Sequence, residues 1–272
     1  MNKINNIIPG IGFGTWKLKN SSDTTKVITD AISCGYRLID TASSYLNEEA
    51  IGKAISCSNR SELFVSGKLW NTDRNNVNEA CEKTIKNLNC EYLDLYLMHW
   101  PASKAVYENW AEINSNVWYQ MENLVKSGKV RNIGVSNFKN NQLEALINTC
   151  SIKPSVNQIE FHPGFMQKGI FEYCKNNEII VQAWSPLRSG RALKKKEIIS
   201  IAEKYGRSPA QICLKWCIQN GVIPIVKSTN IERMKSNLCL DFIIEKEDMH
   251  YLNSLPYMGS SGLDSETLTL FG

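Results

Sequence analysis

The sequence predicts an α/β fold in which a single domain, residues 1–272, forms a (β/α)8 TIM barrel. Short apolar segments alternate with amphipathic segments along the whole chain, and repeated strand–helix units imply a parallel sheet with right-handed crossovers. Eight such units favour closure into a barrel over an open sheet. The length of 272 residues is close to the ~250 residues that such barrels need, and no linker rich in Pro, Gly or Ser divides the chain.

The predicted strands are short runs rich in Ile, Val, Leu and Phe. Because these runs do not alternate with polar residues, they suit strands that are buried on both faces, as in a parallel sheet. We expect strands at residues 11–13, 37–40, 64–68, 93–99, 133–136, 155–160, 179–184 and 223–226.

The segments between the strands have the apolar periodicity of amphipathic helices. We expect helices at residues 24–34, 48–55, 75–88, 117–126, 140–149, 168–176, 197–205 and 231–238, with an extra helix at 210–219. The polar tail over residues 260–272 lacks periodicity, so we expect it to be loosely held.

Capping residues mark the ends of several predicted helices. Asp23 is the expected N-cap of the first helix. Ser208 precedes Pro209, which suits the first position of the extra helix. Gly35 and Gly128 suit the C-terminal position that favours a left-handed residue.

Composition argues against nucleic-acid and membrane binding. The net charge of +4 is mild and forms no basic stripe. We interpret the run at residues 194–196 as a solvated face, with attraction of an anionic ligand as the alternative. No apolar stretch approaches the ~18 residues of a membrane span, and the N-terminus has no apolar signal-peptide core. These features predict a cytoplasmic protein.

The nine cysteines are scattered and include no CxxC pair. In a reducing compartment they are expected to act as small, mostly buried apolar residues. Cys213 and Cys217 lie one helical turn apart, which is the only spacing that resembles a metal site. Because no His or second Cys pair lies nearby, we expect core packing there and no metal.

Polar, proton-handling side chains stand at or just past the ends of the predicted strands. These residues are Asp40, Tyr45, Lys68 and His99. A parallel barrel gathers its strand ends at one mouth, so we expect the four groups to converge there. A Tyr beside a Lys that is held by an Asp can give up its proton near neutral pH.

Two segments could bind a nucleotide. The glycines at positions 10, 12 and 14 resemble part of a Rossmann phosphate loop, but no helix pattern follows them. Near the C-terminus, Lys227, Ser228 and Thr229 follow the last strand, and Arg233 lies in the next helix. Fixed charge and free backbone N–H groups at a helix N-terminus suit a phosphate. An ordinary capped surface helix remains the alternative for these residues alone.

Several segments resemble the signatures of the aldo-keto reductase family. They are GYRLIDTA at residues 35–42 with Tyr45, Asn47, Glu48, Ile51 and Gly52; His99-Trp100-Pro101; KVRNIGVSNF at 129–138; NQIE at 157–160; WSPL at 184–187; and VKS at 226–228 with Arg233, Ser236 and Asn237. All of them occur in the family's order, and the resemblance runs from about residue 10 to residue 263. This order favours the barrel over the Rossmann interpretation.

The resemblance implies NADPH-dependent reduction of aldehydes or ketones to alcohols. Tyr45 would donate a proton to the carbonyl oxygen. Lys68 would stabilise the phenolate, Asp40 would hold Lys68 charged, and His99 would orient the carbonyl by a hydrogen bond. The second hypothesis is an NADPH-binding relative with a regulatory or structural role, such as a channel subunit or lens protein; the intact tetrad argues against lost catalysis.

The resemblance also assigns NADPH/NADP⁺ ligands residue by residue. The implied contacts are Ser136, Asn137 and Gln158 to the carboxamide, Trp184 stacked on the nicotinamide, Ser185 and Leu187 at the pyrophosphate, Lys227, Ser228, Thr229 and Arg233 at the 2′-phosphate, and Asn237 at the adenine. Arg188 stands where Gly is common in the family. We hypothesise that Arg188 and Arg191 fold over the pyrophosphate.

Trp16, Trp70 and Trp100 follow the first, third and fourth strands at the same mouth. Aromatic walls with one polar anchor make an apolar pocket that suits carbonyl compounds, although these side chains could also simply plug the barrel. In the family that this sequence resembles, long C-terminal tails shape steroid pockets, so the brief tail here implies small aldehydes, α-dicarbonyls and keto-sugars instead of steroids. We expect a monomer with a small-molecule carbonyl substrate.

Overall fold

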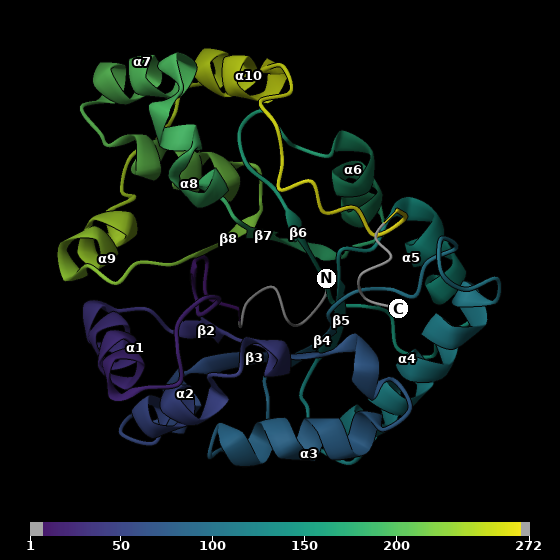
Figure 1. Ribbon diagram of the computed structural model, residues 1–272. Coiled ribbons are helices and arrows are strands. Elements are labelled where there is room, and N and C mark those ends of the chain that lie inside the picture. The colour runs from purple at the N-terminus through teal and green to yellow at the C-terminus, as the bar shows by residue number, and fades with distance from the viewer. Residues whose placement is uncertain (1–7, 268–272) are drawn as a thin grey trace.

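The computed structural model describes residues 8–267 and forms a closed barrel of eight parallel strands with helices around it (Figure 1). The strands are β1 (Gly12–Gly14), β2 (Leu38–Asp40), β3 (Phe64–Leu69), β4 (Leu95–Met98), β5 (Ile133–Ser136), β6 (Val156–Glu160), β7 (Ile180–Trp184) and β8 (Ile223–Val226). Each strand pairs with the next, and β8 closes the barrel against β1. The predicted fold class is confirmed, and each strand lies within two residues of its expected bounds at either end.

The α-helices cover the outside of the barrel (Figure 1). They are α1 (Ser22–Cys34), α2 (Glu48–Ile55), α3 (Val77–Asn87), α4 (Trp110–Lys126), α5 (Asn140–Ile147), α6 (Lys168–Asn176), α7 (Lys196–Tyr205), α8 (Pro209–Gln219), α9 (Ile231–Leu238) and α10 (Lys246–Ser254). All nine predicted helices are present, but α4 begins seven residues earlier than expected. The sequence prediction missed α10, which buries only Asp248 and Leu252 and so shows little apolar periodicity.

The capping predictions are mostly confirmed. Ser208 accepts from the backbone N–H of Gln211, and Pro209 follows in the first turn. Gly35 and Gly128 adopt left-handed φ angles of 116° and 77°. The prediction for Asp23 is wrong: α1 begins one residue before it, so its carboxylate lies in the first turn, where it still complements the helix dipole.

The barrel interior is filled by side chains of alternate strand residues. Leu38, Phe64, Leu95, Leu97, Val156 and Ile225 belong to one buried cluster. A Cβ on Gly12 would lie 2.4 Å from the side chain of Leu38 and 2.5 Å from that of Ile225. This close approach explains the glycine there without a phosphate loop.

The same alternation sets the direction of the catalytic candidates. Because side chains two residues apart share a face of a strand, Asp40 points to the same side as Leu38, and Lys68 to the same side as Phe64. Both polar groups therefore point into the barrel, one step above its apolar filling, at the carboxyl ends of the strands.

Three further expectations can be compared with the structure. Cys213 and Cys217 are fully buried in the apolar core, as predicted. The tail is held more firmly than expected, because Ser261 donates from its backbone N–H and hydroxyl to Glu160. Residues 268–272 of that tail lie outside the described residues. Within residues 8–267, none of the helices is long and apolar enough to cross a membrane.

Candidate active site

Three of the four predicted polar residues make direct contact at the mouth of the barrel. The Nζ of Lys68 lies 2.6 Å from Oδ2 of Asp40, 2.9 Å from the carbonyl oxygen of Thr41 and 3.5 Å from the hydroxyl of Tyr45. Lys68 is fully buried, and Asp40 is 3% exposed. All three ammonium donors are therefore used within the protein.

Short local structures place Tyr45 and His99. Tyr45 ends a 3-10 turn over Ser43–Tyr45 that begins three residues after the end of β2. His99 follows β4, and its backbone N–H donates to the carbonyl of Leu69. The His99 ring packs edge to face against Tyr45, with centroids 5.7 Å apart, and against Trp70, with centroids 5.1 Å apart. The tetrad thus forms one compact group.

The surroundings shift the pKa values of these groups. Burial raises the pKa of Tyr45 and outweighs the opposing effect of the Lys68 charge, so the phenol is protonated near neutral pH. Burial alone would lower the pKa of Lys68, but the Asp40 carboxylate together with Tyr45 raises it overall. Burial, with the Lys68 charge, lowers the pKa of His99 well below its ordinary value, so the imidazole is neutral.

A chain of hydrogen bonds runs from the tetrad toward β7. The side-chain amide of Asn137 donates to the carbonyl of His99 at 3.1 Å and to Oγ of Ser136 at 3.0 Å. The indole N–H of Trp184 donates to Oδ1 of Asn137 at 2.8 Å. These bonds fix the Asn137 amide and the Trp184 ring at the edge of the mouth.

Gln158 belongs to the polar cluster around Asp40 more closely than the sequence suggests. Its Nε2 donates to Oδ1 of Asp40 at 2.9 Å and to Oε1 of Gln182 at 3.0 Å. Its side-chain nitrogen therefore orients Asp40 instead of facing solvent. Gln182, fully buried in β7, was missed in the sequence analysis; its place in an apolar-looking strand was the only signal.

The residues predicted for a phosphate gather around the N-terminus of α9. Asn230 is the N-cap and accepts from the backbone N–H of Arg233. Lys227, Thr229 and Arg233 are exposed there, whereas Asn237 is 5% exposed and lies inside the fold. Ser228 accepts from the backbone N–H of Asn230, so its hydroxyl holds the turn.

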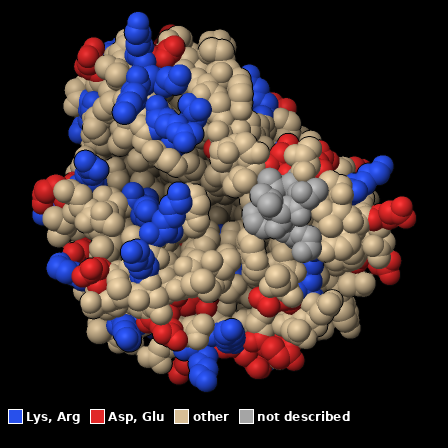
Figure 2. Space-filling view, viewed as in Figure 1, with Lys and Arg blue, Asp and Glu red and all other residues tan. Residues whose placement is uncertain are grey.

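The structure adds a cation that the sequence analysis did not select. Partial desolvation of the exposed Lys227, with the charge of Lys17, lowers the pKa of Lys227. Lys17 follows β1, which pairs with β8, so the loops that carry the two lysines are neighbours at the mouth. Figure 2 shows a hollow near the middle of this face, with Lys and Arg side chains gathered on the side where α1 and α9 lie.

The loop after β7 has an irregular backbone. Ser185, Arg188 and Ser189 all have positive φ angles, between 50° and 55°. Leu187 is partly buried against the main core. Arg188 lies against the C-terminal segment, since a Cβ on Gly259 would be 2.2 Å from its guanidinium, and Arg191 is exposed. The hypothesis that Arg188 and Arg191 fold over the pyrophosphate stays a prediction.

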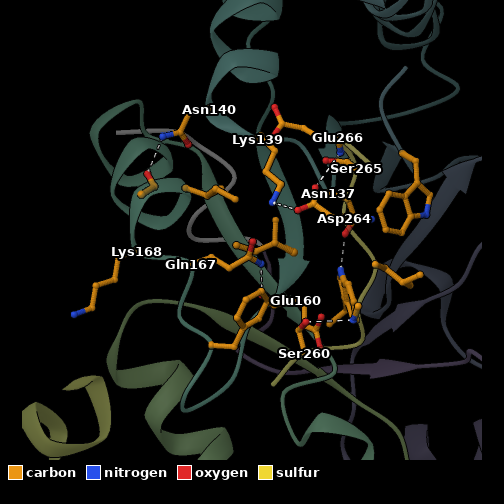
Figure 3. Close-up of a pocket in the computed structure, with 18 of the residues that line it drawn as sticks. Asn137, Lys139, Asn140, Glu160, Gln167, Lys168, Ser260, Asp264, Ser265 and Glu266 are labelled. Carbon is orange, nitrogen blue, oxygen red and sulfur yellow. Dashed lines mark hydrogen bonds and ion pairs between the residues drawn. The ribbon is translucent and has the colours of Figure 1, made fainter. Parts of the chain in front are cut away.

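Figure 3 shows a groove of about 770 Å³ whose lining includes Trp100, which follows His99, and Asn137, which donates to the His99 carbonyl, but none of the tetrad side chains. Asn137, Trp184 and Trp100 line its inner end, and the C-terminal segment with the N-terminal ends of α5 and α6 forms its outer walls. Trp100 is 6% exposed, whereas Trp16 is 53% exposed at the rim. The three predicted tryptophans therefore differ: Trp70 supports His99, Trp100 lines the groove, and Trp16 stands at the edge.

Comparisons with known proteins agree with this geometry. The sequence matches the Aldo/keto reductase family over residues 10–256. It is 42% identical over 253 residues to glyoxal reductase from Bacillus subtilis, covering 91% of this chain and 89% of that protein. It is 40% identical over 256 residues to 9,11-endoperoxide prostaglandin H2 reductase from Trypanosoma cruzi, covering 91% and 88%.

Solved structures give the same result. The crystal structure of a Gox0644 variant in complex with NADPH has a TM-score of 0.88 and 36% identity, with 96% of this chain and 94% of that chain covered. MGS-M4, an aldo-keto reductase from a deep-sea metagenome library, has a TM-score of 0.89 and 35% identity, with 96% of both chains covered. The chain belongs to the aldo/keto reductase family.

Proposed function

We propose that this protein reduces the carbonyl group of small aldehydes and ketones to an alcohol, with NADPH as the hydride donor. The observation that carries the proposal is the arrangement of a protonated Tyr45 within 3.5 Å of the Lys68 ammonium, which Asp40 holds at 2.6 Å. The names of the similar proteins, glyoxal reductase and methylglyoxal reductase, favour short aldehydes and α-dicarbonyls as the substrate class.

Tyr45 serves as the general acid. Its raised pKa keeps the proton on the phenol until the carbonyl oxygen gains negative charge. When that proton leaves, the nearby Lys68 ammonium stabilises the phenolate. Asp40 keeps the ammonium charged and in place, and Gln158 keeps Asp40 oriented.

His99 orients the carbonyl. As a neutral imidazole it carries one ring N–H, which can donate to the carbonyl oxygen and stabilise its developing charge. Its Nδ1 has no hydrogen-bond partner within residues 8–267. The ring is held from two sides by Tyr45 and Trp70, so the donor is preorganised.

The residues at the mouth fit NADPH. Lys17, Lys227 and Arg233, with the backbone N–H groups in the first turn of α9, suit a 2′-phosphate. The hydrogen-bonded Trp184 ring offers a flat surface beside Asn137, near the tetrad. When bound, NADPH supplies the hydride from C4 of its nicotinamide to the carbonyl carbon.

Replacing the proposed acid tests this assignment. Tyr45→Phe removes only the phenolic oxygen, so we expect kcat for methylglyoxal to fall by about 10²–10⁴-fold. The dissociation constant for NADPH, measured by quenching of tryptophan fluorescence, should stay within about twofold, because the assigned cofactor residues are unchanged. Tyr119→Phe, which alters a 62% exposed tyrosine on α4, is the matched control and should leave both values unchanged. Normal turnover by Tyr45→Phe would exclude the mechanism.

A further inference from the structure

Arg74 is a buried cation that the reaction described above does not use. It follows the 3-10 turn Asn71–Asp73 after β3 and is 8% exposed. Arg74 forms no ion pair with any Asp or Glu side chain in residues 8–267, and its Nε has no hydrogen-bond partner there. Its guanidinium lies 5.6 Å from the ring centroid of Tyr107.

A buried guanidinium without a carboxylate partner lowers the stability of the fold. An arginine stays protonated in proteins, so burial removes a full charge from water. Burial lowers the pKa of Arg74, and the neighbouring Tyr107 only partly opposes that effect. A neutral phenol cannot neutralise the charge as a carboxylate does. The site is therefore chemically incomplete within the described chain.

The location of Arg74 links it to the groove of about 770 Å³. It lines a cavity of about 10 Å³ together with Trp100, Pro101, Ser103, Val106, Tyr107 and Ser265. Trp100 and Ser265 also line the large groove. The two spaces therefore share a boundary, one side of which is the C-terminal segment that Figure 3 shows at Ser265.

Arg74 also follows closely, along the chain, a residue that contacts His99. Trp70, whose ring contacts His99, precedes Arg74 by four residues across the 3-10 turn. Arg74 therefore lies close in the chain to the tetrad and at the boundary that its small cavity shares with the groove.

We propose that Arg74 binds a carboxylate carried by the substrate, which rests on the carbonyl-reductase function proposed above. The planar guanidinium matches the geometry of a carboxylate, and the ion pair would form in a site that largely excludes water. The favoured substrates are short carbonyl compounds with a carboxylate a few carbons from the reacting carbon. Arg74 acts by binding and positioning the substrate, not by moving its proton.

A matched pair of substrates tests the proposal. 4-Oxobutanoate and its methyl ester carry the same aldehyde and differ in the carboxylate charge. For the unmodified protein we expect kcat/KM to be about tenfold or more higher for the acid. In Arg74→Gln we expect KM for the acid to rise about tenfold or more with kcat within twofold, and kcat/KM for the ester to stay within twofold.

Two further variants separate this role from its alternatives. Arg74→Lys keeps the charge and should retain part of the preference for the acid. Lys168→Gln removes an exposed cation that lines the outer groove and should leave both substrates unchanged. A loss of acid preference in Lys168→Gln and not in Arg74→Gln would overturn the proposal.

The remaining outcomes are also informative. If Arg74→Gln lowers Tm and reduces both substrates' kcat/KM equally, Arg74 is structural and the proposal fails. If the unmodified protein shows no preference for the acid, the proposal also fails, while reduction of the ester leaves the reductase function standing. If neither substrate, nor methylglyoxal, is reduced with NADPH, the proposed function itself fails.

Discussion

Lys68 and Arg74 are the two Lys or Arg side chains that residues 8–267 bury almost completely, at 0% and 8% exposed. They lie six residues apart, one inside β3 and one in the loop after it. Their pKa values shift in opposite directions. That of Lys68 is raised because the Asp40 carboxylate and Tyr45 outweigh burial, and that of Arg74 is lowered because burial meets no carboxylate.

The comparison shows that the partner, and not burial, decides what a buried cation can do. The ammonium of Lys68 donates hydrogen bonds to Asp40, Thr41 and Tyr45. Its charge is therefore fixed inside the protein and acts on a neighbouring phenol. Arg74 has an unused Nε and no counter-ion in the described chain, so its charge is available to a ligand. The first arrangement suits catalysis and the second suits recognition.

The largest effect should follow from breaking the paired site. Lys68→Met leaves the Asp40 carboxylate buried with Gln158 as its remaining side-chain partner. We expect the free energy of unfolding to fall by about 3–5 kcal/mol, because an uncompensated buried charge remains. Turnover of methylglyoxal should fall by at least about 10²-fold, because the phenolate loses its stabilising charge. Urea unfolding and steady-state kinetics measure the two effects.

A double variant distinguishes the two effects of Lys68. In Lys68→Met with Asp40→Asn, the buried charge is gone, so much of the lost stability should return while turnover stays low. Lys129→Met, which breaks an ion pair with Glu82 that is at least partly exposed on both sides, is the control and should change stability by less than about 1 kcal/mol. Equal losses in Lys68→Met and the control would contradict the assigned role of the buried pair.

The same contrast explains what the sequence could reveal. The barrel and the positions of Asp40, Lys68 and His99 follow from apolar runs that end on polar residues, because a parallel barrel gathers its strand ends. The roles of those residues came from the resemblance to a family, and they remain predictions. The residues around Gln158 in the sequence do not indicate that its amide donates to Asp40, because that hydrogen bond joins residues 118 positions apart.

Other features depend on contacts that no short segment encodes. Arg74 stands in an ordinary polar loop, and its burial arises only when the chain near Tyr107 and Ser265 packs over it. The C-terminal tail is anchored in the same way, by the hydrogen bond from Ser261 to Glu160, which lie 101 positions apart in the sequence. The N-cap of α1 was misplaced by two residues because Ser21, Ser22 and Asp23 are all suitable capping residues.

An exposed cation extends the comparison to the proposed cofactor site. Arg233 has a water-accessible charge at the N-terminus of α9, so its removal should not alter the fold. We expect Arg233→Ala to weaken NADPH binding by about tenfold or more and NADH binding by much less, because only NADPH carries a 2′-phosphate. Isothermal titration calorimetry with each nucleotide measures this. Lys235→Ala, on the same helix and paired with Glu232, is the control. Equal losses for the two nucleotides would remove the 2′-phosphate assignment.

The influence of Lys68 on its neighbours can be measured through pH. Burial, with the Lys68 charge, lowers the pKa of His99, so the unfolded chain binds this proton more readily than the folded one. The contribution of His99 to stability is therefore complete above the ordinary value of 6.5 and is lost as the pH falls below it. We expect the urea stability of His99→Asn to fall less steeply below pH 6.5 than that of the unmodified protein. Identical slopes would show that His99 is not held neutral.

The smallest expected effect is the sharpest test of the comparison. Arg74→Met replaces a buried cation, which has no carboxylate partner in residues 8–267, by an apolar side chain of similar length, so no charge is left behind. We expect the free energy of unfolding to stay within about 1 kcal/mol or to rise, in contrast to the loss in Lys68→Met. Tyr107→Phe, measured beside it, reports how far the phenol supports the guanidinium. If the free energy of unfolding of Arg74→Met instead falls by about 3 kcal/mol or more, the loop depends on this charge for its fold. In that case, the burial of Arg74 without a carboxylate partner does not indicate a ligand site.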